Sequence, residues 1–74
     1  MIKEGMVILN TKHHPCVILK VDDRYCWLFA KTPKGYKCNH YGKWYIEDSI
    51  DRKTYKIVAD YETWQKAVND EVLK

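Results

Sequence analysis

The stretch CVILKVDDRYCWLFAKT, residues 16–32, decides the fold of this chain. Two largely apolar segments, 16–21 and 24–32, flank Asp22-Asp23, a dipeptide that favours a tight turn. Alternate side chains of a strand point to opposite faces, and apolar side chains fall on both faces of these segments. The sequence therefore predicts a long β-hairpin that needs cover on both sides.

The two faces of this hairpin follow from the alternation of side chains. In the first strand one face is expected to carry Val17, Leu19 and Val21, and the other Cys16, Ile18 and Lys20. In the second strand Tyr25, Trp27 and Phe29 alternate with Cys26, Leu28 and Ala30. We expect Trp27 and Phe29 in the hydrophobic core, because both rings are large and lie in the middle of the strand.

Shorter strands are predicted on either side of the hairpin. Apolar runs favour strands over 6–9, 43–46 and 55–59. Polar residues predict connections over 10–15 and 48–53, and a proline–glycine turn is expected over 32–35. Residues 36–43 are aromatic and basic, with Asn39 and Gly42 as breakers, and predict no definite element.

The C-terminal segment predicts a helix over about 61–73. Asp60 is a suitable N-cap, because its carboxylate can accept hydrogen bonds from the first N–H groups of a helix. Apolar residues then recur on one side of a helix, namely Tyr61, Trp64, Val68 and Val72. This stripe is expected to dock on the sheet.

These elements predict a mainly β fold in a single domain over residues 1–74. It is expected to be a small antiparallel barrel of about five strands with a C-terminal α-helix. The alternative is a three-stranded sheet with a helix packed on one face. No apolar run approaches the roughly 20 residues that cross a bilayer, and residues 1–5 open no signal peptide. We therefore expect a cytoplasmic protein with no membrane partner.

Charge is distributed unevenly along the chain. Residues 24–46 contain five basic side chains, seven of the ten aromatic residues and no acidic residue. Residues 47–74 carry five basic and seven acidic side chains, so the net charge of +3 is a local excess that is partly cancelled elsewhere. Positive charge among flat rings is typical of surfaces that hold phosphates and stack bases. It is also typical of a half-buried sheet with lysines on its wet side.

We predict a contact surface within residues 31–45. Its lysines would hold phosphates and its rings would stack on bases. The residues expected to form it are Lys31, Lys34, Tyr36, Lys37, His40, Tyr41, Lys43, Trp44 and Tyr45. The predicted partner is RNA or single-stranded nucleic acid, with an acidic protein surface as the alternative. A homodimer is a further expectation.

Histidine and cysteine form two short pairs, His14 with Cys16 and Cys38 with His40. One residue separates the members of each pair, whereas structural zinc sites usually leave about two to four residues between ligands. We therefore expect no metal and no cofactor. The odd count of three cysteines is expected of reduced thiols, two of them buried and one more exposed.

Three segments follow one another in a recognisable order: GMVIL at 5–9, PCVIL at 15–19 after a polar loop, and LFAKT at 28–32. This order, followed by a late strand and a helix, resembles the PemK/MazF-like toxins. The resemblance implies an SH3-like barrel and a metal-independent endoribonuclease, usually dimeric and paired with an antitoxin. Thr32 matches the family pattern directly, and His14 stands where the family has its catalytic arginine. His14 and Thr32 are therefore the candidate catalytic residues.

Three functions are expected as alternatives. The first is a small binding module for nucleic acid or an acidic partner that uses residues 31–45, with a composition that suits a phage or mobile-element protein. The second is a PemK/MazF-like endoribonuclease that uses His14 and Thr32, since a base, a cation and a hydroxyl near a phosphate are sufficient. The third is an interaction protein whose exposed apolar residues complete a partner's core.

Overall fold

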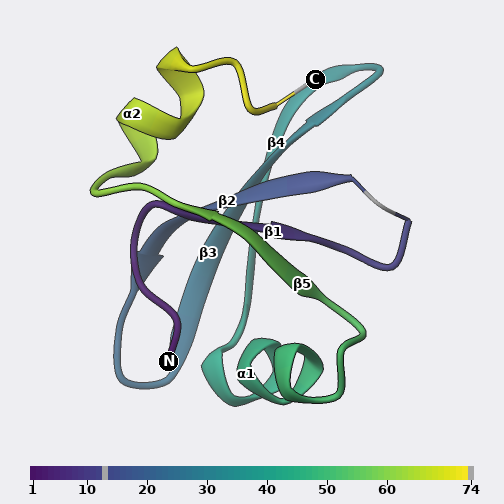
Figure 1. Ribbon diagram of the computed structural model, residues 1–74, viewed down its shortest axis with the longest axis vertical. Helices are drawn as coiled ribbons and strands as arrows, with labels where there is room; N and C mark the ends of the chain where they lie inside the picture. The colour runs from purple at the N-terminus through teal and green to yellow at the C-terminus, as the bar shows by residue number, and fades with distance from the viewer. Residues whose placement is uncertain (13, 74) are drawn as a thin grey trace.

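The predicted hairpin lies within a five-stranded antiparallel sheet. A computed structural model describes residues 1–12 and 14–73, so His13, in the predicted 10–15 connection, and Lys74 lie outside the described residues. The strands are β1 (Met6–Leu9), β2 (Pro15–Val21), β3 (Tyr25–Thr32), β4 (Gly35–Gly42) and β5 (Lys56–Asp60). Helix α1 (Lys43–Asp51) joins β4 to β5, and α2 (Trp64–Asn69) follows β5 (Figure 1).

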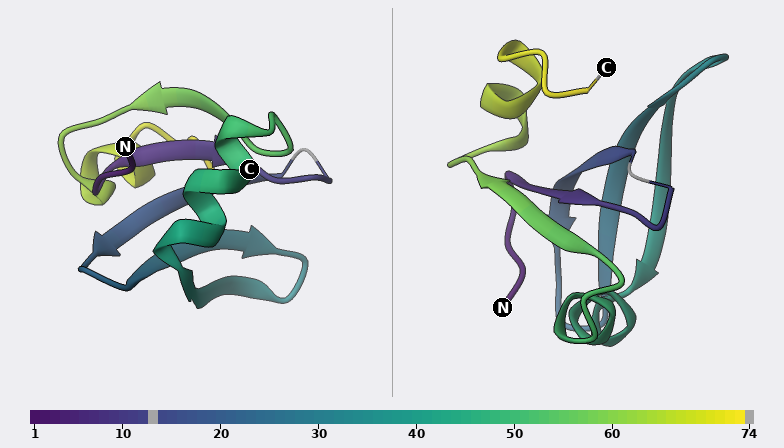
Figure 2. Two further views of the ribbon diagram at one scale, coloured as in Figure 1. Left: turned by 90° about the horizontal axis from the view of Figure 1, so that it is seen from below. Right: turned by 45° about the vertical axis from the view of Figure 1, so that its right-hand side comes forward.

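The mainly β prediction is confirmed, with five antiparallel strands and a short C-terminal helix. The order across the sheet is β4-β3-β2-β1-β5. Within the described residues β4 and β5 are the two edges, so the sheet does not close into a barrel. Helix α1 instead crosses one end of the sheet from the β4 side to the β5 side (Figure 2). No helix in the described part of the chain is long and apolar enough to cross a membrane.

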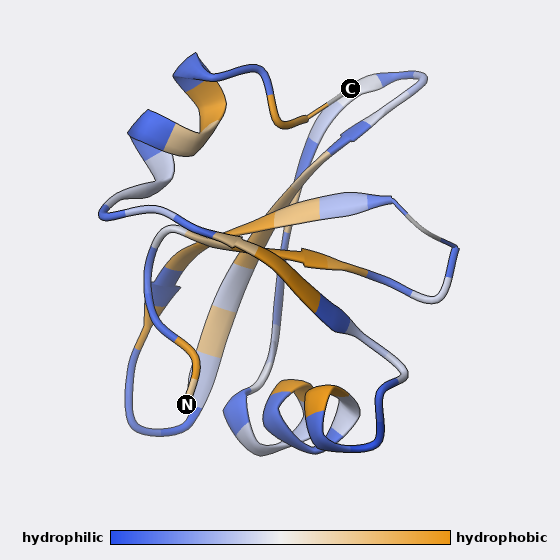
Figure 3. Cartoon of the chain, in the orientation of Figure 1, coloured by the Kyte–Doolittle hydropathy of each residue, from blue (hydrophilic) through white to orange (hydrophobic). Residues whose placement is uncertain are grey.

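Two hydrophobic cores lie on opposite faces of the sheet. The core on the α1 side includes Ile8, Ile18, Cys26, Leu28 and Ile46. The core on the α2 side is formed by Val7, Val17, Ala67 and Leu73. Neighbouring residues of β1 and β2 thus enter different cores, as the alternation predicts. Figure 3 shows the hydrophobic stretches where the strands cross and on the sides of the helices that face them.

Two predictions about the faces of the hairpin are wrong. The register between β2 and β3 shifts between Ile18 and Lys20, which is the mark of a bulge. Val21 therefore packs on the α1 side with Ile18 and not on the face of Val17. Trp27 is half-buried and belongs to neither described core. The inward face of β3 is the other one, which carries Cys26 and Leu28, and Phe29 is only partly buried against the α2-side core.

Helix α1 replaces the strand predicted over 43–46 and most of the loop predicted over 48–53. Ile46 and Ser49 are buried three residues apart, which is the spacing of the inner side of a helix. The sequence conceals this helical period because the second buried position, Ser49, is polar, while the apolar run KWYI at 43–46 favours a strand. Its hydroxyl donates a hydrogen bond to the Tyr45 carbonyl, 2.8 Å away, and so can be buried without loss.

Strand β4 covers most of the segment for which the sequence predicts no definite element. Its eight residues pair with β3 in unbroken register, from Tyr25 opposite Gly42 to Thr32 opposite Gly35. Most of its side chains are exposed or half-buried on both faces. No hydrophobic alternation therefore marks this strand in the sequence.

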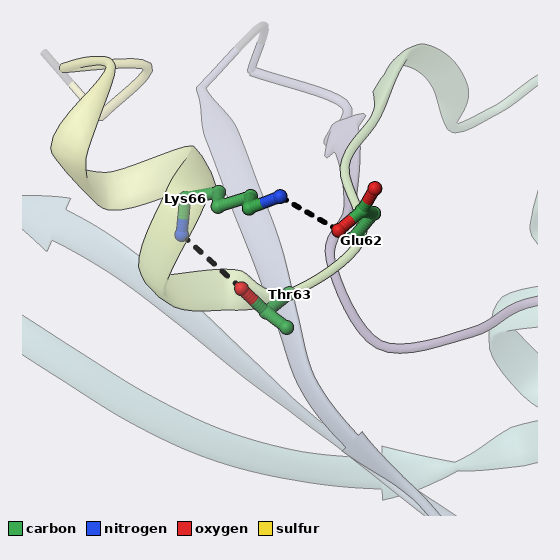
Figure 4. A network of polar contacts seen from close by, with 3 residues as sticks. All are labelled: Glu62, Thr63 and Lys66. Carbon is green, nitrogen blue, oxygen red and sulfur yellow. Dashed lines mark hydrogen bonds and ion pairs between the residues drawn. The ribbon is translucent and has the colours of Figure 1, made fainter.

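Helix α2 is shorter than the helix predicted over 61–73 and starts later. Its N-cap is Thr63, whose hydroxyl accepts a hydrogen bond from the Lys66 N–H at 3.4 Å, whereas the predicted cap, Asp60, ends β5 (Figure 4). The Lys66 Nζ also lies 2.6 Å from the Glu62 carboxylate. The predicted docking is confirmed, because all four residues of the stripe pack against the α2-side core: Tyr61, Trp64, Val68 and Val72.

Candidate functional site

A cleft of about 420 Å³ opens between the β1–β2 connection and the end of the β3–β4 hairpin. Four residues with basic side chains line it: Lys12, His14, Lys31 and Lys37. Lys31 pairs with Tyr36, so its side chain starts on the other face of the sheet and reaches only the rim of the cleft. Among the described residues that line the cleft, none is acidic. We call this site the basic cleft.

Strand pairing builds one wall of the basic cleft. Leu28 pairs with Asn39, and Ala30 pairs with Lys37. Residues two apart in a strand share a face, so Lys37, Asn39 and Tyr41 lie on the face that carries Leu28 and Ala30. Because that face is the α1 side of the sheet, its buried part forms the cleft floor and Lys37 extends from it toward water.

Asn10 holds the opposite wall. Its side-chain Oδ1 accepts hydrogen bonds from the backbone N–H of Lys12 at 2.9 Å and of His14 at 3.0 Å. The backbone N–H of Asn10 in turn donates to the His14 carbonyl, 3.1 Å away. An asparagine that binds the backbone in this way fixes a turn. Asn10 therefore sets the positions from which Lys12 and His14 extend into the cleft.

The turn between β3 and β4 carries the rim of the cleft. It is a two-residue loop of Pro33 and Lys34 between the paired residues Thr32 and Gly35, as predicted. The Thr32 hydroxyl donates a hydrogen bond to the Gly35 carbonyl at 2.8 Å and accepts one from the Lys34 N–H at 3.2 Å. The hydroxyl hydrogen of Thr32 is thus already engaged within the turn.

Three tyrosines meet at the inner end of the cleft. The Tyr41 and Tyr45 rings are nearly parallel, with centres 6.2 Å apart, and the Tyr55 ring stands perpendicular to Tyr45 at 6.4 Å. Tyr41 and Tyr55 line the cleft itself. Burial, and then the neighbouring Tyr45 hydroxyl, raise the pKa of Tyr55 to about 12. The Tyr55 hydroxyl therefore keeps its proton at neutral pH.

The structure brings five of the predicted site residues together. Both candidate catalytic residues and three members of the predicted contact surface line the basic cleft: His14, Thr32, Lys31, Lys37 and Tyr41. Tyr45 reaches the same place from α1 through its contacts with Tyr41 and Tyr55. These residues come from the β1–β2 connection, β3, β4 and α1.

The rest of the predicted contact surface lies elsewhere. Tyr36 and His40 belong to the opposite face of β4, because they alternate with Lys37 and Tyr41. Lys34 lies in the turn at the hairpin end. Lys43 and Trp44, at the start of α1, line a separate hollow of about 430 Å³ together with acidic residues, Asp23 and Glu47.

Several residues of the cleft are not predicted from the sequence, among them Lys12, Asn39 and Tyr55. Lys12 lies in a polar connection, where a lysine carries no pattern of its own. Asn39 interrupts an aromatic and basic run and is typical of a loop in that setting. Tyr55 reaches the cleft only because β5, which follows it, pairs with β1, and no local signal predicts that pairing.

The histidine and cysteine pairs are separated by the sheet. Cys16 enters the α1-side core, whereas Cys38 and His40 lie on the opposite face of β4. In the part of the chain that the structure describes, no three His, Cys, Asp or Glu side chains lie close enough to share a metal ion. The predicted exposure of the thiols is confirmed, with Cys16 and Cys26 buried and Cys38 exposed.

Comparisons with protein-family models, with curated proteins and with solved structures found no match for this chain. The resemblance to PemK/MazF-like toxins therefore stays a prediction.

Proposed function

We propose that the protein binds single-stranded nucleic acid, RNA in particular, with the phosphate backbone in the basic cleft. The supporting observation is that four basic residues and no acidic one are among the described residues that line the cleft. A chain of phosphates gains affinity from several such groups at once, because each contact releases condensed counterions. An acidic protein would be attracted by the same charge, but its binding would not explain the tyrosine rings beside that charge.

The tyrosines favour a nucleic acid over a simple anion. Tyr41 and Tyr55 both line the cleft, and each carries a flat ring. A base that stacks on an aromatic ring contributes about 1–3 kcal/mol, whatever the base. The volume of about 420 Å³ falls within the usual range of ligand sites. The cleft thus combines a rim suited to phosphate with an interior suited to a ring.

Salt dependence of binding tests this proposal. The anisotropy of a fluorescent oligouridylate is measured with the protein at low and at near-physiological salt. Contacts with the phosphates of a single strand predict that log K falls with log salt by a slope of about 0.7 per contact. Absence of binding at low salt would contradict the proposal. Displacement of the oligonucleotide by an equal concentration of oligoglutamate of the same charge would assign the cleft to acidic proteins instead.

A second function, RNA cleavage without a metal, is favoured by one observation. His14, Lys31 and Thr32 line the same recess of about 290 Å³ at the rim of the cleft. In this reaction the His14 imidazole would take the proton of a ribose 2′-hydroxyl, whose oxygen attacks the adjacent phosphorus. The bond to the 5′-oxygen breaks, that oxygen takes a proton from water, and a 2′,3′-cyclic phosphate remains. The Lys31 ammonium would stabilise the negative charge that develops on the phosphoryl oxygens.

Incubation of a mixed RNA pool with the protein in the presence of a chelator tests this second function. Cleavage that is lost in His14→Ala and leaves cyclic phosphate ends would support it. A DNA pool is the control, because DNA has no 2′-hydroxyl to act as nucleophile. An intact RNA pool, or cleavage that survives His14→Ala, would exclude this mechanism.

A further inference from the structure

The face of β3 and β4 that points away from the basic cleft carries aromatic rings that serve neither core. Tyr25, Trp27 and His40 form a triangle, with ring centres 6.4 Å apart for Tyr25–Trp27, 5.7 Å for Tyr25–His40 and 6.4 Å for Trp27–His40. Tyr25 and Trp27 belong to neither hydrophobic core of the described residues. Tyr25 is 45% exposed and His40 is exposed. The Tyr25 and His40 rings therefore face water, and Trp27 is half-buried between them and the sheet.

The same face continues toward the hairpin end with a second ring pair. Tyr36 lies almost parallel to Phe29, with ring centres 4.9 Å apart and planes at 11°. Tyr36 is 59% exposed, so Phe29 covers one side of its ring and the other side remains accessible. Phe29 packs against the α2-side core and holds this pair in place. We call Tyr25, Trp27, Tyr36 and His40 the outer aromatic face.

The charge of this face suits an anionic ligand. The Lys20 Nζ lies over the Trp27 ring, 5.2 Å from its centre, so an ammonium group covers that side of Trp27 and adds positive charge to this face. Neither β3 nor β4 contains an acidic residue. The acidic groups near its two ends are Asp22 and Asp23, beside Tyr25, and Glu71, beside Tyr36. Asp22 is turned toward its own loop, where its carboxylate accepts two backbone hydrogen bonds.

We propose that the outer aromatic face stacks bases of the same single strand whose phosphates lie in the basic cleft. The proposal rests on the proposed function and extends the binding site around β4. Strand β4 is an edge of the sheet, with Lys37 on the cleft side and Tyr36 next to it on the outer side. A nucleic acid that leaves the cleft over this edge reaches the outer rings with no further strand between. A duplex could not use them, because its paired bases are stacked on one another.

Three fluorescent probes of about 12 nucleotides, a length within the range of single-strand sites, separate the contributions of base and backbone. They are an oligouridylate, an abasic oligomer with the same backbone, and an RNA duplex. We expect the oligouridylate to bind the protein about fivefold or more tightly than the abasic oligomer and more tightly than the duplex. Tyr25→Leu and Tyr36→Leu, which keep an apolar side chain but lose the ring, should each reduce the preference for oligouridylate over the abasic oligomer, and stacking on Tyr41 and Tyr55 in the cleft should account for the remainder.

Matched variants make the outcomes distinct. Tyr36→Phe keeps the ring and should keep the preference for bases, and Trp44→Leu removes an exposed ring from α1 and should leave the preference unchanged. Lys37→Gln should weaken both probes alike. Equal binding of both probes by the unaltered protein would overturn this inference, together with stacking in the cleft, and leave phosphate binding by the basic cleft intact. A preference for bases that is undiminished by both tyrosine-to-leucine changes would overturn this inference alone, and binding of neither probe would overturn the proposed function itself.

Discussion

The Thr32 hydroxyl donates a hydrogen bond to the Gly35 carbonyl, 2.8 Å away, across the turn that carries the rim of the basic cleft. This bond assigns the hydroxyl a role in shaping the turn. Thr32→Val removes the bond and keeps the branched shape that suits a strand. We expect a loss of about 1 kcal/mol in the free energy of unfolding, measured with urea, and an unchanged affinity for oligouridylate. Unchanged stability together with a loss of RNA binding or cleavage would instead assign the hydroxyl to the ligand.

Substitution of Gly5 tests how tightly the chain packs where β5 ends. Its φ is +89°, and its carbonyl accepts a hydrogen bond from the Tyr61 N–H at 3.1 Å. A Cβ at this position would overlap the Tyr61 carbonyl oxygen. Gly5→Ala should therefore lower the free energy of unfolding by more than the roughly 1–2 kcal/mol of left-handed strain.

Gly35→Ala is the matched control for that prediction. Gly35 has a φ of +117°, but a Cβ there would meet no atom within 4 Å. We expect the alanine at this position to add backbone strain without overlap and so to destabilise the protein less. Equal losses for the two variants in urea unfolding would show that the contact between Gly5 and Tyr61 is not tight.

The Asp22 carboxylate should make part of the free energy of unfolding depend on pH in the acid range. Hydrogen bonds from the Tyr25 and Arg24 backbone N–H groups hold the pKa of this carboxyl below its usual 3.8. Folding thus favours the charged form, so the contribution to stability is present above that pH and is lost as pH falls through the lower folded value. The stability gap between the unaltered protein and Asp22→Ala should narrow from neutral pH to about pH 2. Asp23→Ala is the control, and an equal narrowing for both variants would contradict the prediction.

Tyr55 should ionise at a higher pH than an ordinary tyrosine. Its pKa is raised from 10 to about 12, chiefly by burial, so folding favours the neutral hydroxyl. The stabilising contribution is complete below pH 10 and is lost as pH rises through about 12. In an alkaline titration followed by tyrosinate absorbance, the difference between the unaltered protein and Tyr55→Phe should appear near the raised value. A difference centred on the ordinary value would show that Tyr55 is solvated.

The sequence predicts the strands that bury apolar side chains, but it does not predict the edge strand β4 or helix α1. The β2–β3 hairpin is confirmed because two apolar runs flank a turn whose Asp22 carboxylate closes it. Strand β4 carries no hydrophobic alternation, since both its faces are largely open, and only its pairing with β3 makes it a strand. In α1, the buried Ser49 hides the helical period.

The sequence predicts several residues of the candidate site but not which of them lie together. Charge and a resemblance predict His14, Lys31 and Lys37 as site residues, whereas their common position at the cleft depends on sheet order and register. The block of rings and lysines suggests one surface in sequence, but alternation along β4 divides it between two faces. Lys43 and Trp44 line a separate hollow because they lie at the start of α1, a helix that the sequence does not predict.

The salt dependence of two charge-removal variants tests the central claim most directly. Lys37→Gln removes a charge from the basic cleft, and Lys66→Gln removes one from α2, where Lys66 pairs with Glu62. Both variants lower the net charge by one. We predict that Lys37→Gln weakens oligouridylate binding and reduces the slope of log K against log salt by about 0.7, while Lys66→Gln changes neither. Equal effects of the two variants would mean that net charge, and not the basic cleft, attracts the nucleic acid.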